Sequence, residues 1–119
     1  MKPPNERARR GLSTEAALFY LRWLRYARAG WLSEYHTGRL AEDRQFDPSV
    51  DRVATLFWRA HLLGLVDLTQ ARVGPEESWQ SDAEAQYNYK ARRTALPVSE
   101  TIELALSDIF NPRRQYGGR

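Results

Sequence analysis

The chain has 119 residues, which is enough for one domain with a hydrophobic core and too few for two. It contains no cysteine, so a disulfide framework, a thiolate metal site and a thiol nucleophile are excluded. It has two histidines, which leave little for a histidine-based metal centre or a catalytic triad. The formal net charge is +3, but residues 1–13 and residues 112–119 each carry +3, so the segment 14–111 between them carries −3.

Both ends of the chain contain prolines or glycines and show no apolar periodicity. We therefore expect a flexible basic tail at 1–13, a single domain at 14–110 and a second basic tail at 111–119. The most apolar segment, 16–32, is interrupted by three arginines, which a membrane-spanning helix would hardly tolerate. The first residues lack the apolar stretch of a signal peptide, so we expect a soluble cytoplasmic protein without a membrane partner.

The first predicted element is a helix over 14–29, with Ser13 as its N-cap and Gly30 as its C-terminal stop. Its apolar face is broad, and a last predicted helix over 98–110 has a second such face. The core of one small domain is not large enough to bury both of these apolar faces and the four tryptophan side chains as well. We therefore predict a homodimer through helix 14–29, helix 98–110, or both.

The middle of the chain predicts two more helices. The first is short and weakly marked, lies within 33–42, and precedes a polar turn at 43–46. The second covers 48–63, because Asp47 is suited to cap it and Pro48 is suited to its first position. We interpret His61, on its apolar face, as a hydrogen-bonded core residue rather than a ligand, and His36 as an exposed residue.

After Gly64 the pattern changes to alternating apolar and polar residues, which predicts a strand over 65–73. A polar loop, 74–86, separates it from a second predicted strand over 87–96, and the two strands form a hairpin. The predicted fold class is therefore mainly α with a small β-hairpin.

Two segments resemble transcriptional regulators of the MarR and PadR type. Segment 58–68, WRAHLLGLVDL, is similar to the end of their third helix and the strand that follows it. Segment 87–94, YNYKARRT, is similar to their aromatic and basic second wing strand. The resemblance spans about 14–110 and implies a winged helix-turn-helix domain with three helices, a two-stranded wing and a C-terminal helix that often serves dimerisation.

The resemblance also implies that helix 48–63 reads duplex DNA in the major groove. The side chains that this helix would offer to bases and phosphates are Ser49, Arg52, Thr55 and Arg59. Further phosphate contacts are expected from Arg44 before the helix and from the hairpin residues Arg72, Lys90, Arg92 and Arg93. In the N-terminal tail, Arg7, Arg9 and Arg10 are candidates for an arm in the minor groove.

The loop 74–86 argues for an alternative, because it carries Glu76, Glu77, Asp82 and Glu84 and no cation. These carboxylates would repel a DNA backbone. The alternative is a protein–protein interaction module, or an inhibitor of a nucleic-acid-handling protein, with the loop imitating phosphate charge and Trp79 as an anchor. We predict no enzyme, cofactor or metal site, because no carboxylates converge and no phosphate-binding loop occurs.

Overall fold

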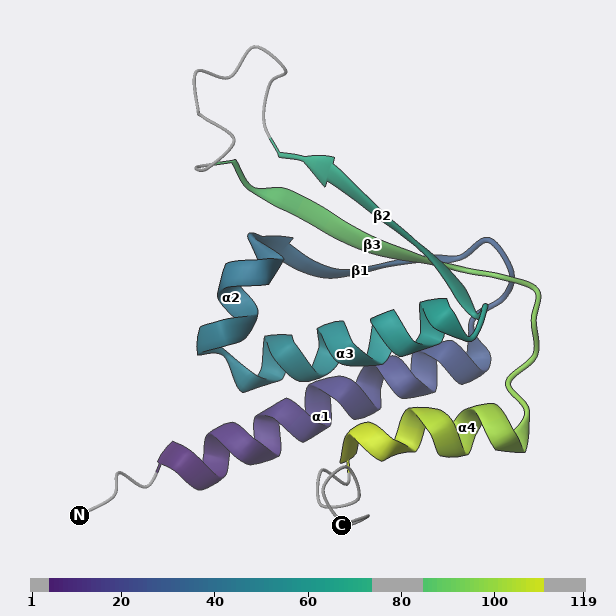
Figure 1. Cartoon of the computed structure of the whole chain (residues 1–119), viewed down its shortest axis with the longest axis horizontal. Helices are drawn as coiled ribbons and strands as arrows, with labels where there is room; N and C mark the ends of the chain where they lie inside the picture. Colours follow the sequence, from purple (N-terminus) through teal and green to yellow (C-terminus); the bar gives the residue numbers. More distant parts are fainter. Residues whose placement is uncertain (1–4, 74–84, 111–119) are drawn as a thin grey trace.

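The computed structural model describes the backbone at residues 5–73 and 85–110, and the side chains of these ranges from Glu15 onward; residues 1–4, 74–84 and 111–119 lie outside the description. The elements follow one another as α1 (Asn5–Tyr26), β1 (Leu32–Gly38), α2 (Leu40–Phe46), α3 (Pro48–Leu62), β2 (Val66–Arg72), β3 (Tyr87–Arg93), α4 (Glu100–Ser107) and a 3-10 turn, η1 (Asp108–Phe110). Figure 1 shows the sheet on one side of α3, with α1 and α4 on the other.

The sheet has three antiparallel strands in the order β1-β3-β2. The expected fold, a mainly α winged helix-turn-helix with a two-stranded wing, is therefore wrong, and the fold is α+β with a three-stranded sheet. The additional strand, β1, occupies most of the segment where a short helix was predicted. Its side chains alternate between exposed and half-buried from Leu32 to Tyr35, up to a register shift between Glu34 and His36. This alternation is the pattern of a strand with one buried face.

Two helix boundaries also differ from the prediction. Helix α1 begins at Asn5, so much of the segment expected to be a flexible tail is helical, and Ser13 lies inside the helix rather than at its N-cap. Helix α2 begins at Leu40 and includes the expected polar turn at 43–46. It has seven residues, and no side chain caps its N-terminus. Such a short helix depends on packing against its neighbours, here α3 (Figure 1).

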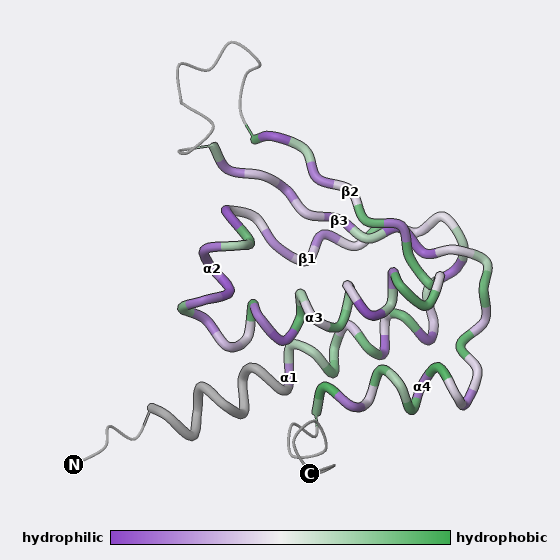
Figure 2. The backbone as a smooth tube through the Cα atoms, in the orientation of Figure 1, coloured by the Kyte–Doolittle hydropathy of each residue, from purple (hydrophilic) through white to green (hydrophobic). Residues whose placement is uncertain are grey.

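The core forms around α3, whose buried residues face α1 and the sheet. Phe57 is fully buried and stacks on Tyr35 of β1, with 4.5 Å between the ring centroids. Tyr20 and Trp23 of α1 approach the same ring edge-on at 5.2 Å and 6.1 Å. Burial raises the pKa of Tyr35 to about 12. Hydrophobic residues recur along α1, α3 and α4 (Figure 2), and Leu106 brings α4 into the same core.

None of the helices in the described part of the chain combines the length and the hydropathy that crossing a membrane requires.

Candidate nucleic-acid interface

Helices α2 and α3 follow one another with a single residue, Asp47, between them. Its Oδ1 accepts hydrogen bonds from the backbone N–H groups of Ser49 at 2.9 Å and Val50 at 3.4 Å. Pro48 occupies the first turn, where its missing N–H costs nothing. The predicted start of this helix is confirmed, and the cap fixes the direction in which α3 leaves α2.

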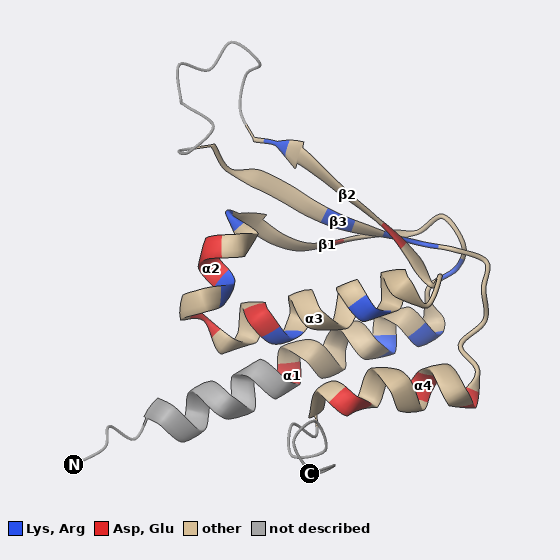
Figure 3. Cartoon of the chain, in the orientation of Figure 1, with Lys and Arg blue, Asp and Glu red and all other residues tan. Residues whose placement is uncertain are grey.

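Helix α3 buries one side and leaves the other accessible. Val53, Leu56 and Phe57 are buried, whereas the predicted DNA-reading side chains Ser49, Arg52, Thr55 and Arg59 are all half-buried. Within the described ranges, Arg59 has no ion-pair partner. Figure 3 shows that charged residues of both signs lie on α2 and α3, whereas α4 carries acidic residues only.

Arg44 of α2 is joined to α3 by two hydrogen bonds. Its Nε donates to Oδ1 of Asp51 at 2.8 Å, and its Nη2 donates to Oγ1 of Thr55 at 3.1 Å. The Thr55 hydroxyl in turn donates to the backbone carbonyl of Asp51 at 2.9 Å. We expected Arg44 to contact a phosphate, but its charge is already offset by a carboxylate on the same face.

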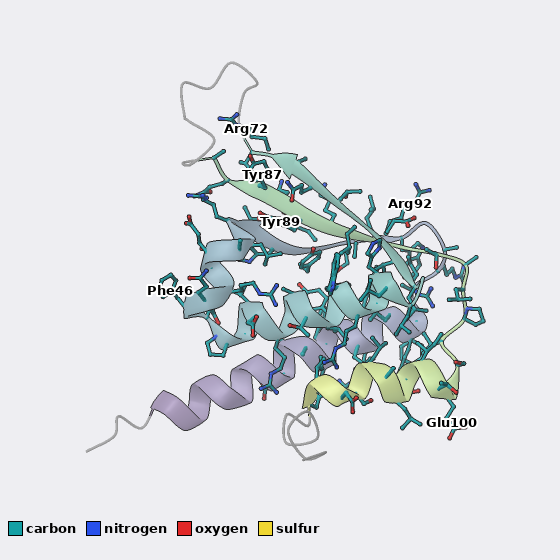
Figure 4. The ribbon with its side chains drawn as sticks, in the orientation of Figure 1. Phe46, Arg72, Tyr87, Tyr89, Arg92 and Glu100 are labelled. Carbon is teal, nitrogen blue, oxygen red and sulfur yellow. The ribbon has the colours of Figure 1, made fainter. Side chains whose placement is uncertain are left out.

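Two cations of β3 lie directly opposite carboxylates on the neighbouring strands. Lys90 is paired in register with Glu34 of β1, and Arg92 with Asp67 of β2. Opposite charges at such positions attract each other across a sheet. Arg92 is exposed and points away from the sheet (Figure 4), so it remains able to reach a phosphate. The outer face of the sheet is nevertheless balanced in charge rather than basic.

Arg93 cannot serve as a phosphate contact, because its side chain is only 5% exposed. Its Nε donates to the carbonyl of Leu24 at 2.8 Å. Its Nη1 donates to the carbonyls of Leu65 at 3.2 Å, Thr94 at 2.8 Å and Leu96 at 2.8 Å. Burial lowers the pKa of this guanidinium from its ordinary value. Arg93 therefore ties the end of α1 to the sheet, and its assignment to the DNA contacts is corrected.

The other predicted contacts are only partly described. Arg72 is half-buried at the end of β2, in register with Tyr87. The backbone of the segment with Arg7, Arg9 and Arg10 belongs to α1, but these side chains lie outside the description, so their role as a minor-groove arm stays a prediction. The same holds for the proposed interaction residues of the loop, Glu76, Glu77, Trp79, Asp82 and Glu84.

Both histidines differ from the prediction in their exposure to solvent. His36 is half-buried rather than exposed, and its Nε2 lies 2.7 Å from Oδ2 of Asp43. This hydrogen bond, together with one from the backbone N–H of Arg39, lowers the pKa of Asp43. His61 is exposed rather than in the core, although its Nδ1 lies 3.2 Å from the carbonyl of Val66. Among the described residues, no three or more histidine, aspartate or glutamate side chains lie close enough together to bind a metal ion.

Exposed apolar side chains on α2 and α3 were not singled out from the sequence. Trp58 and Leu62 are 55% and 67% exposed, and lie one helical turn apart on α3. Phe46, at the end of α2, is 85% exposed and points away from the body of the molecule (Figure 4). A helical wheel places Trp58 beside the polar residues of α3, and this position could have indicated from the sequence that Trp58 is exposed.

A small pocket lies between the start of α2 and β3, lined by Arg39, Ala41, Glu42, Tyr87 and Tyr89. Its volume is about 130 Å³. An ion pair of 3.0 Å joins Arg39 to Glu42 at its rim. Pockets for cofactors are usually several times larger, so we assign no cofactor to it.

Comparison of the chain with protein-family models, curated proteins and solved structures found no match. The function is therefore argued from the chain's own residues.

Proposed function

We propose that this protein binds duplex DNA, with α3 in the major groove, as a cytoplasmic regulator of the kind that its 58–68 and 87–94 segments resemble. The observation that supports the proposal is the pair of consecutive helices α2 and α3, in which α3 carries the half-buried polar side chains Arg52, Thr55 and Arg59. In many DNA-binding proteins the second of two such helices enters the major groove while the first crosses the backbone. Arginine is the side chain best suited to bind guanine through two hydrogen bonds.

The distribution of charge predicts how this binding depends on salt. Arg44 is paired with Asp51, Lys90 and Arg92 lie opposite carboxylates, and Arg93 is buried. The described residues therefore offer few cations for phosphates, and each phosphate that is neutralised contributes about 0.9 to the slope of log affinity against log salt. We expect a shallow slope and weak non-specific binding, with preference for a sequence supplied by α3.

Fluorescence anisotropy of labelled duplexes tests the proposal. A preferred duplex is first selected from a random library, and its binding is then measured over a range of salt concentrations. Replacing Arg52 and Arg59 together by Ala is expected to reduce affinity for this duplex by about tenfold or more. Replacing Arg22 of α1 and Arg28, which follows α1, removes the same charge at exposed positions outside α3, and is the matched control.

Two outcomes would overturn the proposal. One is that the wild-type protein binds no duplex at low salt. The other is that the α3 pair and the control pair, Arg22 and Arg28, weaken binding equally, since this would show an attraction to net charge without reading by α3.

A specific observation also favours the alternative, a protein–protein interaction module or inhibitor. Trp58 and Leu62 expose apolar surface on α3 itself, and exposed tryptophan is typical of binding hot spots. The acidic loop with Glu76 and Glu77 would contribute charge to the same kind of contact. Binding of a protein partner that is lost in Trp58→Ser and in the charge reversal of Glu76 and Glu77, combined with no duplex binding, would favour this function over the first.

We further propose that the protein is a homodimer through α1, α4, or both. Phe19 and Tyr26 of α1 are 64% and 79% exposed, and Leu104 of α4 is 64% exposed. Large apolar side chains at this exposure indicate surfaces that a second molecule covers. A two-fold dimer would present two copies of α3 to successive half-sites of an operator.

A further inference from the structure

The structure places Asp51 at the centre of a network of contacts between α2 and α3. Asp51 lies in the first turn of α3, and its side chain is 52% exposed. Arg44 holds its Oδ1 at 2.8 Å, and Thr55 bonds to its backbone carbonyl. Among the described residues, no donor is bonded to its Oδ2.

This carboxylate shares the accessible side of α3 with Arg52 and Thr55. At 100° per residue, positions 51, 52 and 55 fall within one 100° arc of the helix. The N-terminal residues of a recognition helix are the ones that reach base edges. Asp51 therefore lies where a base contact is expected, not at the periphery of the interface.

An isolated carboxylate would be repelled by the DNA backbone, but the guanidinium of Arg44 offsets its charge at hydrogen-bond distance. The contact to Oδ1 also fixes the side chain from the direction of α2, which leaves Oδ2 as an acceptor with a defined orientation. A carboxylate can only accept hydrogen bonds. In the major groove, only cytosine N4 and adenine N6 donate.

We propose that Asp51 reads a cytosine by accepting a hydrogen bond from its N4 amino group, and that Arg44 is a positioning residue for this contact rather than a phosphate ligand. This inference rests on the proposed DNA binding. Cytosine is favoured over adenine because adenine presents its N7 acceptor beside N6, and two acceptors repel each other. Guanine and thymine offer the carboxylate no donor in this groove.

Selection of duplexes from a random library, followed by sequencing, tests the inference with the full chain. The wild-type preference is expected to include a cytosine at one position that Asp51→Asn changes. Because asparagine bonds to both N6 and N7 of adenine, this variant is expected to prefer adenine there, with a change of about tenfold in the relative affinity for the two bases. Arg44→Ala is expected to weaken the cytosine preference at the same position, and to leave the salt slope unchanged.

The matched control is the ion pair between Arg25 of α1 and Glu103 of α4, which also joins two helices but includes no residue of α3. Arg25→Ala and Glu103→Gln are expected to leave every base preference unchanged. A double variant of Arg44 and Asp51 that loses no more cytosine preference than Asp51→Asn alone would support action of Arg44 through Asp51.

Three outcomes would overturn the inference. If Asp51→Asn leaves all base preferences unchanged while the Arg52 and Arg59 variants abolish binding, DNA binding stands and the role of Asp51 is wrong. If Arg44→Ala lowers the salt slope by about one, Arg44 is a phosphate ligand. If the wild-type protein binds no duplex, the proposed function and this inference fail together.

Discussion

Arg93 stabilises the fold through hydrogen bonds to four backbone carbonyls, of which the Leu65 carbonyl also accepts from Thr94. Arg93→Ala is expected to lower the free energy of unfolding by about 3 kcal/mol or more, because unsatisfied buried polar groups cost about 1–3 kcal/mol each. Arg92→Ala is the control, since this neighbour on β3 is exposed and its loss should change stability by less than about 0.5 kcal/mol. Urea unfolding of both variants measures the difference, and equal losses would show that Arg93 is not a structural tie.

Gly38 is required at the end of β1 for two reasons. Its φ is +139°, a region that other residues rarely adopt, and an added Cβ would lie 2.5 Å from Oδ2 of Asp43 and 3.2 Å from Nε2 of His36. Gly38→Ala is therefore expected to separate this pair and to cost about 2–3 kcal/mol of stability. Gly30→Ala tests backbone strain alone, because φ is +90° there and no atom lies within 4 Å of the added Cβ. Its expected cost is about 1 kcal/mol, and a similar cost for both variants would contradict the steric argument.

Tyr35 predicts a loss of stability at alkaline pH. Burial raises its pKa to about 12, whereas an unfolded chain loses this proton near the ordinary tyrosine pKa of 10.0. Between these values the folded state holds more protons than the unfolded state, so the free energy of unfolding falls as the pH rises. Tyr35→Phe keeps the stack on Phe57 and removes the titration. Urea unfolding at two pH values, below and above 10, should show a smaller alkaline loss for this variant than for the wild type, and an identical loss would be inconsistent with a buried Tyr35.

At the scale of elements, the sequence was sufficient to predict those helices and strands whose bounds are determined by residues close in the chain. Helix α3 was predicted with its start at Pro48 because a capping carboxylate precedes a proline, and both act within one turn. Strand β2 was predicted to within one residue at each end, because apolar and polar residues alternate after Gly64, and strand β3 was predicted with its start at Tyr87. These signals do not depend on the rest of the molecule.

The errors occurred where distant contacts decide the structure. Strand β1 exists because β3, more than fifty residues later, pairs with it, and because Tyr35 stacks on Phe57. The burial of Arg93 follows from carbonyls of three separate segments, which no local pattern shows. The pairing of Arg44 with Asp51 likewise depends on the angle between α2 and α3. The candidate site could therefore be located on α3, but the contacts of its charges could not be predicted.

The N-cap of α3, Asp47, is expected to stabilise the start of this helix. Asp47→Ala removes the acceptor for two backbone N–H groups, and is expected to cost about 1 kcal/mol of stability. Asp47→Asn keeps a side-chain oxygen at the cap and should recover most of this loss. Thermal unfolding measures both. If the two variants are destabilised equally, the carboxylate charge rather than the hydrogen bonds stabilises the helix start.

At the scale of the whole molecule, the remaining exposed apolar surface predicts assembly. Phe19 and Tyr26 are seven residues apart and share one side of α1, and a bond between Arg25 and Glu103 brings α4, with its exposed Leu104, alongside α1. The apolar surface at Trp58 and Leu62 belongs to a different helix, α3. A dimer built on α1 therefore leaves α3 accessible, as a DNA-binding protein requires.

Sedimentation velocity tests this assembly with the full chain. The wild type is expected to be dimeric at micromolar concentrations, and Phe19→Ser with Tyr26→Ser to weaken the dimer by tenfold or more, because burial of each aromatic side chain contributes about 1.5–3 kcal/mol. Trp58→Ser is the control, because it removes a similar apolar area from α3 and should leave the dimer unchanged. A wild-type monomer would refute the dimer. Dissociation by Trp58→Ser alone would instead place the contact on α3, and because α3 cannot cover a partner subunit and enter a groove at once, that result would also argue against DNA binding.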